Sequence, residues 1–180
     1  MHPLSKAGAV RDDRNFLQRA VDAAIVSIPR GGGPFGAIVV TSDGQVYEGT
    51  DTVLTTNDST AHAEMNAIRA ASQGQENYDL SGSVLYSSSE PCPMCLTAAL
   101  WARIDRIVYA ATADRAAASG FDDASFYRQL KRGVDSVSDA AIEHLRLPTA
   151  NEPFDSWDSY EGRIDFWSGA SRHDLRTNAR

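Results

Sequence analysis

Hydrophobic and polar positions in the first quarter of the chain predict one helix followed by a hairpin. Over residues 12–28, apolar side chains recur with helical spacing, and acidic residues open the stretch as the helix dipole favours. Pro29 and the glycines after it end this pattern. Segment 34–51 then holds two apolar runs joined by Asp43-Gly44, a pair typical of a tight hairpin turn.

The central part of the chain alternates between helical and strand patterns. We expect Asp58, Ser59 or Thr60 to cap the first helix of this part, because their side-chain oxygens accept from free backbone N–H groups. Pro93 is favoured in the first turn of the second helix. The predicted elements are a polar loop over 52–60, a helix over 61–74, a strand over 83–88, a helix over 93–101 and a strand over 106–111.

The C-terminal third carries weaker patterns and many aromatic residues. A GFDD loop precedes a helix predicted around 125–130, and 140–147 is predicted as a last strand. The tail is polar but aromatic-rich, which suggests docking, for instance on another subunit. Helices and strands that alternate over short connections indicate an α/β layered fold. The predicted organisation is a flexible arm over 1–13, a single domain over 14–169 and a polar tail over 170–180.

Composition and charge favour a small molecule as the partner of this chain. The 180 residues carry a net charge of -7, and basic residues form no run that could follow a phosphate backbone, so nucleic acid is not expected. No apolar run approaches the roughly 20 residues that span a bilayer, and the N-terminus lacks the apolar centre of a secretory signal. A membrane is therefore not expected as a partner, and we expect a cytoplasmic protein.

Both cysteines lie in one cluster, Pro91-Cys92-Pro93-Met94-Cys95, and a His-Ala-Glu triplet precedes it by about thirty residues. In a reducing compartment, a pair of cysteines three apart indicates a metal site or a redox pair rather than a structural disulfide. Zinc binds thiolate and imidazole, and three protein ligands with one open position are typical of hydrolytic zinc sites. His62, Cys92 and Cys95 supply such a set.

Glu64 is the expected proton carrier of this site, since hydrolysis that expels an amine needs a group that takes a proton from water and returns it to nitrogen. Residues i and i+2 of a regular helix point roughly 200° apart. His62 and Glu64 therefore share a site only if the first turn of their helix is irregular. A redox CxxC pair and a closed structural zinc site remain the alternatives.

The spacing HxE followed by PCxxC is the signature of zinc deaminases, and the chain resembles the cytidine deaminase superfamily. Within it, the chain resembles bacterial guanine deaminases more than tRNA adenosine deaminases. The motifs that carry the resemblance are GGPFGAIVV (32–40), NDSTAHAEMNAIR (57–69), SEPCPMC (89–95), LWAR (100–103) and AASGFDD (117–123).

The resemblance implies a three-layer α/β/α fold on a five-stranded mixed sheet. It implies one catalytic Zn²⁺ per subunit on His62, Cys92 and Cys95, with Glu64 as proton shuttle and the Pro91 carbonyl directed toward the leaving amine. It also implies a homodimer, in which the C-terminal segment is swapped between subunits.

Substrate contacts are expected from a further set of residues. Phe35 and Trp101 are candidates for apolar walls, although an aromatic residue of a helix is more often plain packing. Ala63 is a further expected substrate contact. By resemblance, Asp123 contacts the base, and a carboxylate suits a ring edge that presents N–H and NH₂ together, as in guanine.

Two positions depart from the family pattern. Asp51 stands where an Asn is usual, and Phe166 stands where a Tyr is usual, so both changes remove a hydrogen-bond donor. Guanine to xanthine, with release of ammonia, is the favoured reaction. Another amino-purine, a nucleoside of guanosine or cytidine type, cytosine or an aminotriazine remains an alternative substrate. The other classes are tRNA adenosine editing and a zinc protein without catalysis.

Overall fold

The computed structural model describes residues 12–133, 142 and 144–162. These residues fall into two units, one up to Arg132 and one beyond it. The single domain expected over 14–169, with its arm and tail, stays a prediction. In the described part of the chain, no helix combines the length and the apolar character needed to cross a bilayer.

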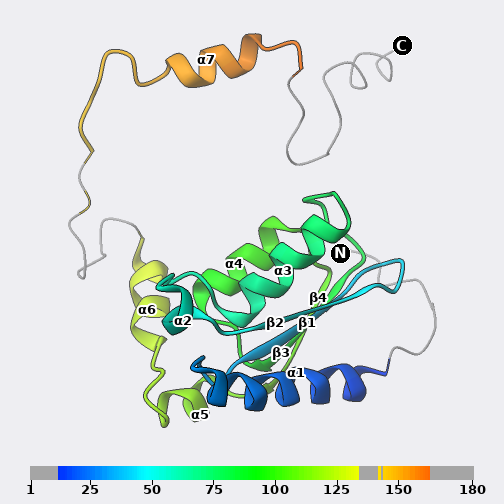
Figure 1. The fold of residues 1–180 in the computed structure, drawn as a ribbon. Coiled ribbons are helices and arrows are strands. Elements are labelled where there is room, and N and C mark those ends of the chain that lie inside the picture. The colour runs from blue at the N-terminus through cyan, green and yellow to red at the C-terminus, as the bar shows by residue number, and fades with distance from the viewer. Residues whose placement is uncertain (1–11, 134–141, 143, 163–180) are drawn as a thin grey trace. The chain divides into compact units, whose positions relative to one another are not determined.

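In the first unit, a sheet lies between helices (Figure 1). Its strands are β1 (Gly36–Val40), β2 (Val46–Thr50), β3 (Val84–Ser89) and β4 (Arg106–Ala111). Its helices are α1 (Asp13–Ser27), the short 3-10 helix η1 (Ile28–Arg30), α2 (Val53–Thr56), α3 (Ala63–Gly74), α4 (Pro93–Trp101), α5 (Ala113–Ala117) and α6 (Ala124–Arg132). The second unit contains α7 (Glu152–Ser159).

The sheet is mixed, with strand order β2-β1-β3-β4. Strand β1 pairs antiparallel with β2 across the predicted hairpin and antiparallel with β3, whereas β3 and β4 run parallel. The predicted α/β class and mixed sheet are confirmed by this topology and by a structural match reported below. The predicted number of strands is wrong, because the described residues form four strands rather than five.

The strand predicted over 140–147 accounts for the difference. Residues 144–147 adopt no strand, and 140, 141 and 143 lie outside the described residues. A strand that buries one face needs apolar residues two apart. Leu145 and Leu147 have this spacing, but Ile142, Leu145 and Leu147 are all exposed, so no apolar face of the segment is buried.

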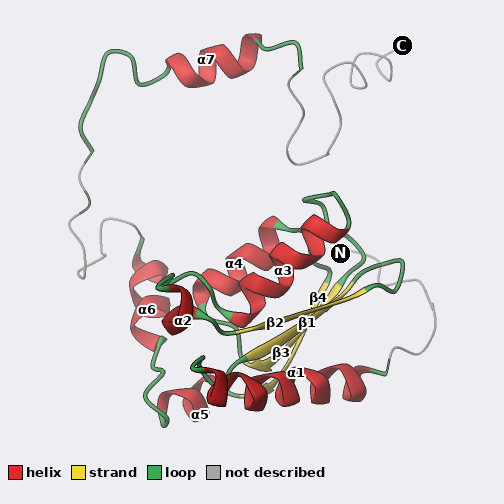
Figure 2. Cartoon of the chain, in the orientation of Figure 1, coloured by secondary structure: helices red, strands yellow, loops and turns green. Residues whose placement is uncertain are grey.

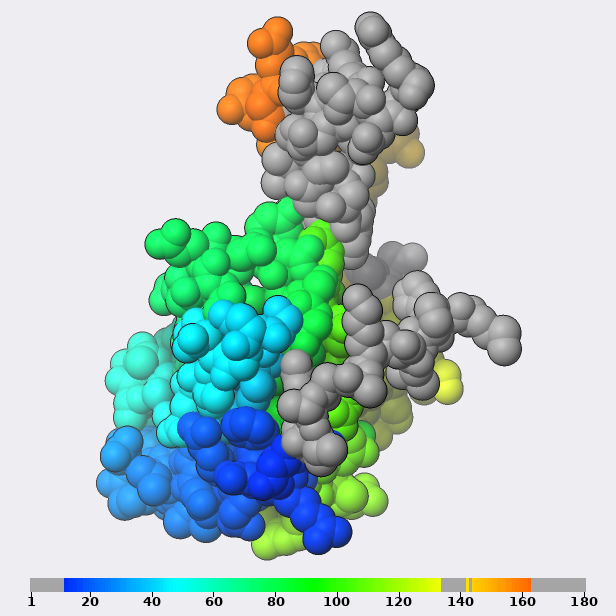
Figure 3. Space-filling view, turned by 90° about the vertical axis from the view of Figure 1, so that its right-hand side faces the viewer, coloured from blue at the N-terminus to red at the C-terminus, as the bar shows by residue number. Residues whose placement is uncertain are grey.

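The two faces of the sheet build two apolar cores. Along β1, Ala37 and Val39 pack with α3 and α4, while Ile38 and Val40 pack with α1, as the alternation of strand side chains requires. Helix α1 therefore covers one face and α3 with α4 covers the other (Figure 2). In the space-filling view, the β1–β2 hairpin adjoins α1 (Figure 3).

Gly49 of β2 allows α3 to lie directly against the sheet. A Cβ at this position would stand 2.2 Å from the carbonyl oxygen of Ala63, well inside van der Waals contact. The contact fixes the first turn of α3 at the edge of the sheet. This turn follows His62 and includes Glu64, so Gly49 helps to place the candidate catalytic groups.

Most predicted elements of the first unit are confirmed, and two local features are not. The expected caps are wrong, because His62 itself precedes α3 and Asp58 instead accepts from the Thr60 N–H and hydroxyl. The predicted loop over 52–60 contains the short helix α2. Both differences arise in a segment whose polar side chains bond locally, which periodicity does not reveal.

Candidate active site

His62 stands at the N-cap of α3 with extended backbone angles, φ -66° and ψ 157°. Because this residue lies outside the helix, the 200° separation of regular i and i+2 positions does not apply. His62 and Glu64 both line the same pocket. The irregular first turn that a shared site requires is therefore present.

The two cysteines approach His62 from the start of α4. Cys92 is the N-cap residue and Cys95 is buried in the first turn. Each Sγ lies 3.6 Å from His62 Nδ1, and the three ligand atoms lie within 4.8 Å of one another. Zinc bonds of about 2.3 Å to sulfur and 2.0 Å to nitrogen separate the two elements by roughly 3.5 Å in a tetrahedral site. The three residues therefore fit a zinc ion.

The protonation of the cluster suits a metal site. A hydrogen bond from Cys95 lowers the pKa of Cys92 to about 4 and raises the pKa of Cys95 above its ordinary value. The hydrogen bond with Cys92 also raises the pKa of His62. Cys92 is thus ready to bind as a thiolate, and metal binding displaces the remaining proton of the pair.

Glu64 is 5% exposed, and its Oε1 accepts a hydrogen bond of 3.0 Å from the hydroxyl of Ser87 on β3. Burial raises the pKa of the Glu64 carboxyl. A carboxyl with a raised pKa binds a proton more readily, which suits a group that takes up and releases protons during a reaction. Ser87 was not anticipated from the sequence. It holds the carboxylate in one orientation from the adjacent strand.

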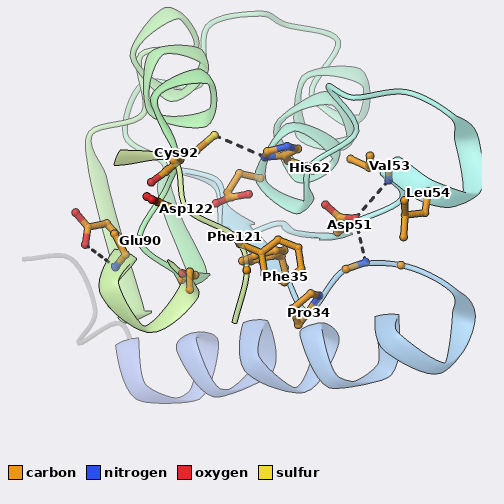
Figure 4. A pocket seen from close by; sticks show the side chains of 18 of the residues that line it. Pro34, Phe35, Asp51, Val53, Leu54, His62, Glu90, Cys92, Phe121 and Asp122 are labelled. Carbon is orange, nitrogen blue, oxygen red and sulfur yellow. Dashed lines mark hydrogen bonds between the residues drawn. The ribbon is translucent and has the colours of Figure 1, made fainter. Parts of the chain in front are cut away.

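A pocket of about 560 Å³ opens beside the zinc ligands. This volume is in the range of small-molecule sites. Figure 4 shows that its walls come from the loop before β1, the segment around α2, the start of α3 and the loop before α6. The lining acids are Asp51, Glu64, Glu90, Asp122 and Asp123, and the larger apolar residues are Ile28, Phe35, Leu54, Phe121 and Phe126.

Asp51 forms part of this wall and is 7% exposed. Its Oδ1 accepts from the backbone N–H groups of Gly33, at 3.0 Å, and Val53, at 3.3 Å (Figure 4). The two bonds fix the carboxylate through one oxygen. The other oxygen adds a second acceptor to the pocket wall.

The loop before α6 closes another side of the pocket. Phe121 packs edge-on against Phe35 with ring centroids 4.9 Å apart, and burial raises the pKa of the neighbouring Asp123. Tyr127 of α6 donates a hydrogen bond of 2.8 Å to the Pro91 carbonyl, directly before Cys92. Helix α6 is thereby linked to the residue that directly precedes the zinc ligand Cys92.

Four of the expected substrate contacts lie outside the pocket or outside the described residues. Trp101 ends α4, about 12 Å along the helix from Pro93 by the rise per residue, and is 51% exposed rather than in the pocket wall. Ala63 packs in the core, and the Pro91 carbonyl accepts from Tyr127. Phe166 lies outside the described residues.

Several residues that line the pocket were not predicted from the sequence. Phe121 and Phe126 flank Asp123 and were not singled out, although two aromatic residues beside a GFDD loop are a signal for a ring-binding wall. Ile28 and Leu54 carried no such signal. They reach the pocket only because η1 and α2 place them at its edge.

Comparison with known families places this geometry in context. Residues 10–111 match the cytidine and deoxycytidylate deaminase zinc-binding region. The guanine deaminase of Bacillus subtilis is 40% identical over 157 residues, which cover 84% of this chain and 97% of that protein. Its X-ray structure matches with a TM-score of 0.80 and 39% identity, over 85% of this chain and 98% of that chain.

Two further matches are more distant. A tRNA-specific adenosine deaminase of Buchnera aphidicola is 37% identical over 100 residues, covering 56% of this chain and 66% of that protein. A solved complex with 8-azaguanine matches with a TM-score of 0.58 and 33% identity, over 62% of this chain and 65% of that chain. These matches and the ligand cluster confirm the predicted resemblance and the zinc cofactor.

Proposed function

Because the chain belongs to the cytidine and deoxycytidylate deaminase family of zinc-binding proteins, we propose that it deaminates guanine to xanthine by hydrolysis. One observation carries the proposal. A pocket of ring size brings the zinc ligands and the buried Glu64 together with Asp123, a wall carboxylate suited to an N–H-bearing ring edge.

The residues divide the reaction between them. His62, Cys92 and Cys95 would hold the zinc ion, which would supply an activated water for attack on the amine-bearing carbon. Glu64 takes a proton from this water and returns it to the departing nitrogen, so that the amine leaves as ammonia and the ring gains a carbonyl. Ser87 keeps Glu64 oriented for both transfers.

The charge of the pocket supports a free base over a nucleotide or tRNA. Among the residues that the structure describes, those that line the pocket include five carboxylic acids and neither lysine nor arginine. A phosphate group would therefore enter an environment of like charge. Phe35 and Phe121 offer apolar surface to a flat ring, while Asp51 and Asp123 accept from its N–H groups.

Other bases that are rich in hydrogen-bond donors form the second set of proposed substrates, because the Asp51 carboxylate can accept from their N–H groups. Since this carboxylate only accepts hydrogen bonds, it also suits an aminotriazine or a cytosine-like ring with an additional N–H group. We further propose a homodimer in the cytoplasm, on the strength of the family resemblance and the aromatic C-terminal segment. Pro91, Ala63 and Phe166 remain proposed contacts.

A substrate panel tests the proposed function. Zinc-loaded protein should release ammonia from guanine faster than from guanosine, adenine, cytosine, cytidine or an aminotriazine. The matched control is Glu64→Gln, which should keep one zinc per chain by metal analysis yet lose at least about a thousandfold in turnover, because it removes the proton carrier. Absence of ammonia release from guanine would refute guanine deamination, and an active Glu64→Gln variant would refute the role of Glu64.

A further inference from the structure

Ser89 is the last residue of β3 and lines the pocket beside His62 and Glu64. The residue is 6% exposed. Among buried side-chain nitrogen and oxygen atoms in the part of the chain that the structure describes, its hydroxyl oxygen is the one without a hydrogen-bond partner. A buried hydroxyl without a partner destabilises a protein, so such a group calls for an explanation.

The two preceding serines of the strand use their hydroxyl groups within the protein. The Ser87 hydroxyl donates to Glu64, and the Ser88 hydroxyl accepts from the Gly36 N–H at 3.0 Å. Strand alternation turns Ser87 and Ser89 to the same face of the sheet, toward the catalytic groups. Ser89 therefore occupies a position like that of Ser87 but lacks its partner.

The remaining polar side chains of the pocket indicate what this hydroxyl can bind. The lining acids accept hydrogen bonds when ionised, while His62 and Cys92 belong to the zinc site. Of the lining side chains within residues 12–133, 142 and 144–162, Ser89 is the one that donates a hydrogen bond without first taking up a proton and without binding the metal. A heteroaromatic base also has acceptors, namely ring nitrogens or a carbonyl oxygen, which carboxylates cannot satisfy.

We propose that the Ser89 hydroxyl donates a hydrogen bond to an acceptor atom of the bound base and thereby contributes to substrate selection. This inference rests on the proposed function for the choice of a base as ligand. Ser89 selects ring nitrogens or carbonyl oxygens, whereas Asp51 and Asp123 select N–H groups. A buried site that bonds a polar substrate atom discriminates strongly against bases that lack this atom.

Binding of 8-azaguanine to the zinc-loaded protein tests the inference. Titrations are made in a Glu64→Gln background, so that the ligand is not consumed. Ser89→Ala should weaken binding about tenfold, through loss of one buried hydrogen bond. Ser89→Cys, which keeps the side-chain shape but donates weakly, should weaken it similarly. The free Ser89→Ala protein should unfold at the same or a higher temperature, because an unpartnered hydroxyl is removed.

Ser88→Ala is the matched control, since it removes a neighbouring buried hydroxyl that has a partner. It should lower the unfolding temperature and leave the dissociation constant within about twofold. Unchanged binding of 8-azaguanine by Ser89→Ala would overturn the inference while guanine deamination still stands. The titration is then repeated with the base on which the unchanged protein is most active. If that base is not guanine but loses affinity in Ser89→Ala, the proposed function fails and the inference stands.

Discussion

At the scale of single residues, Asp51 is fixed through one carboxylate oxygen, which accepts from Gly33 and Val53, and its proposed role is to accept from the base through the other oxygen. Asp51→Asn should keep the bonds from Gly33 and Val53, because an amide oxygen accepts as a carboxylate oxygen does. The other atom then becomes an N–H donor, which matches a ring nitrogen beside an N–H group, as in a purine. We expect the ratio of kcat/KM for guanine to that for an aminotriazine to rise by about fivefold or more.

Steady-state ammonia release with both bases measures this ratio. Asp105→Asn, at an exposed position outside the pocket wall, controls for the loss of one negative charge. An unchanged ratio in Asp51→Asn would show that Asp51 does not contact the base.

The individual residues of the site also differ in how well they could be predicted from the sequence. His62, Cys92, Cys95 and Glu64 were predictable because metal ligands and a proton carrier impose residue type and spacing together. Trp101 lies at the end of α4 and outside the described pocket lining, and residue type alone does not give this distance along a helix, so its substrate contact stays a prediction. The hydrogen bond from Ser87 to Glu64 joins residues that are 23 positions apart in the sequence, and no local pattern encodes such a contact.

At the scale of elements, the Tyr127 hydroxyl of α6 donates a hydrogen bond to the carbonyl of Pro91, which directly precedes Cys92. Asp123 lies one turn before Tyr127. Tyr127→Phe removes this bond and keeps the ring. We expect faster amide exchange in peptides over 120–132 and a KM for guanine raised about fivefold, with a smaller change in kcat, because the carboxylate of Asp123 is less well positioned.

Hydrogen-deuterium exchange followed by mass spectrometry and steady-state kinetics provide the two measurements. Tyr109→Phe, on β4 and outside the pocket lining, is the matched loss of a hydroxyl. Equal exchange in Tyr127→Phe and the unchanged protein would show that the bond does not hold α6.

Among the described helices, α2, α5 and α7 escaped prediction, and α7, with 8 residues, lies in the segment that was read only as an aromatic tail. Helices α2 and α5 have 4 and 5 residues, fewer than two turns, so no repeat of apolar positions exists to detect. The long α1 and the hairpin were predictable because their patterns repeat. The first turn of α3 depends instead on Gly49, whose close approach to the Ala63 carbonyl is a tertiary contact.

At the scale of the whole molecule, the C-terminal unit exposes the aromatic residues Phe154, Trp157 and Tyr160 on or beside α7. Exposed aromatic side chains at this density are typical of association surfaces. The sequence predicted this aromatic character, but assembly depends on a second chain, which periodicity cannot reveal. The proposed homodimer is therefore tested in solution.

Light scattering coupled to size exclusion should give about twice the 19.5 kDa chain mass for the unchanged protein. The double substitution Phe154→Ala and Trp157→Ala removes exposed aromatic surface without disturbing the core. It should therefore weaken the dimer by at least about tenfold in Kd, if these rings anchor the interface. Activity on guanine should fall in parallel as the protein is diluted, because the proposed swap would place the C-terminal segment of one chain in the pocket of its partner. A monomer with full activity would contradict both the dimer and the swapped segment.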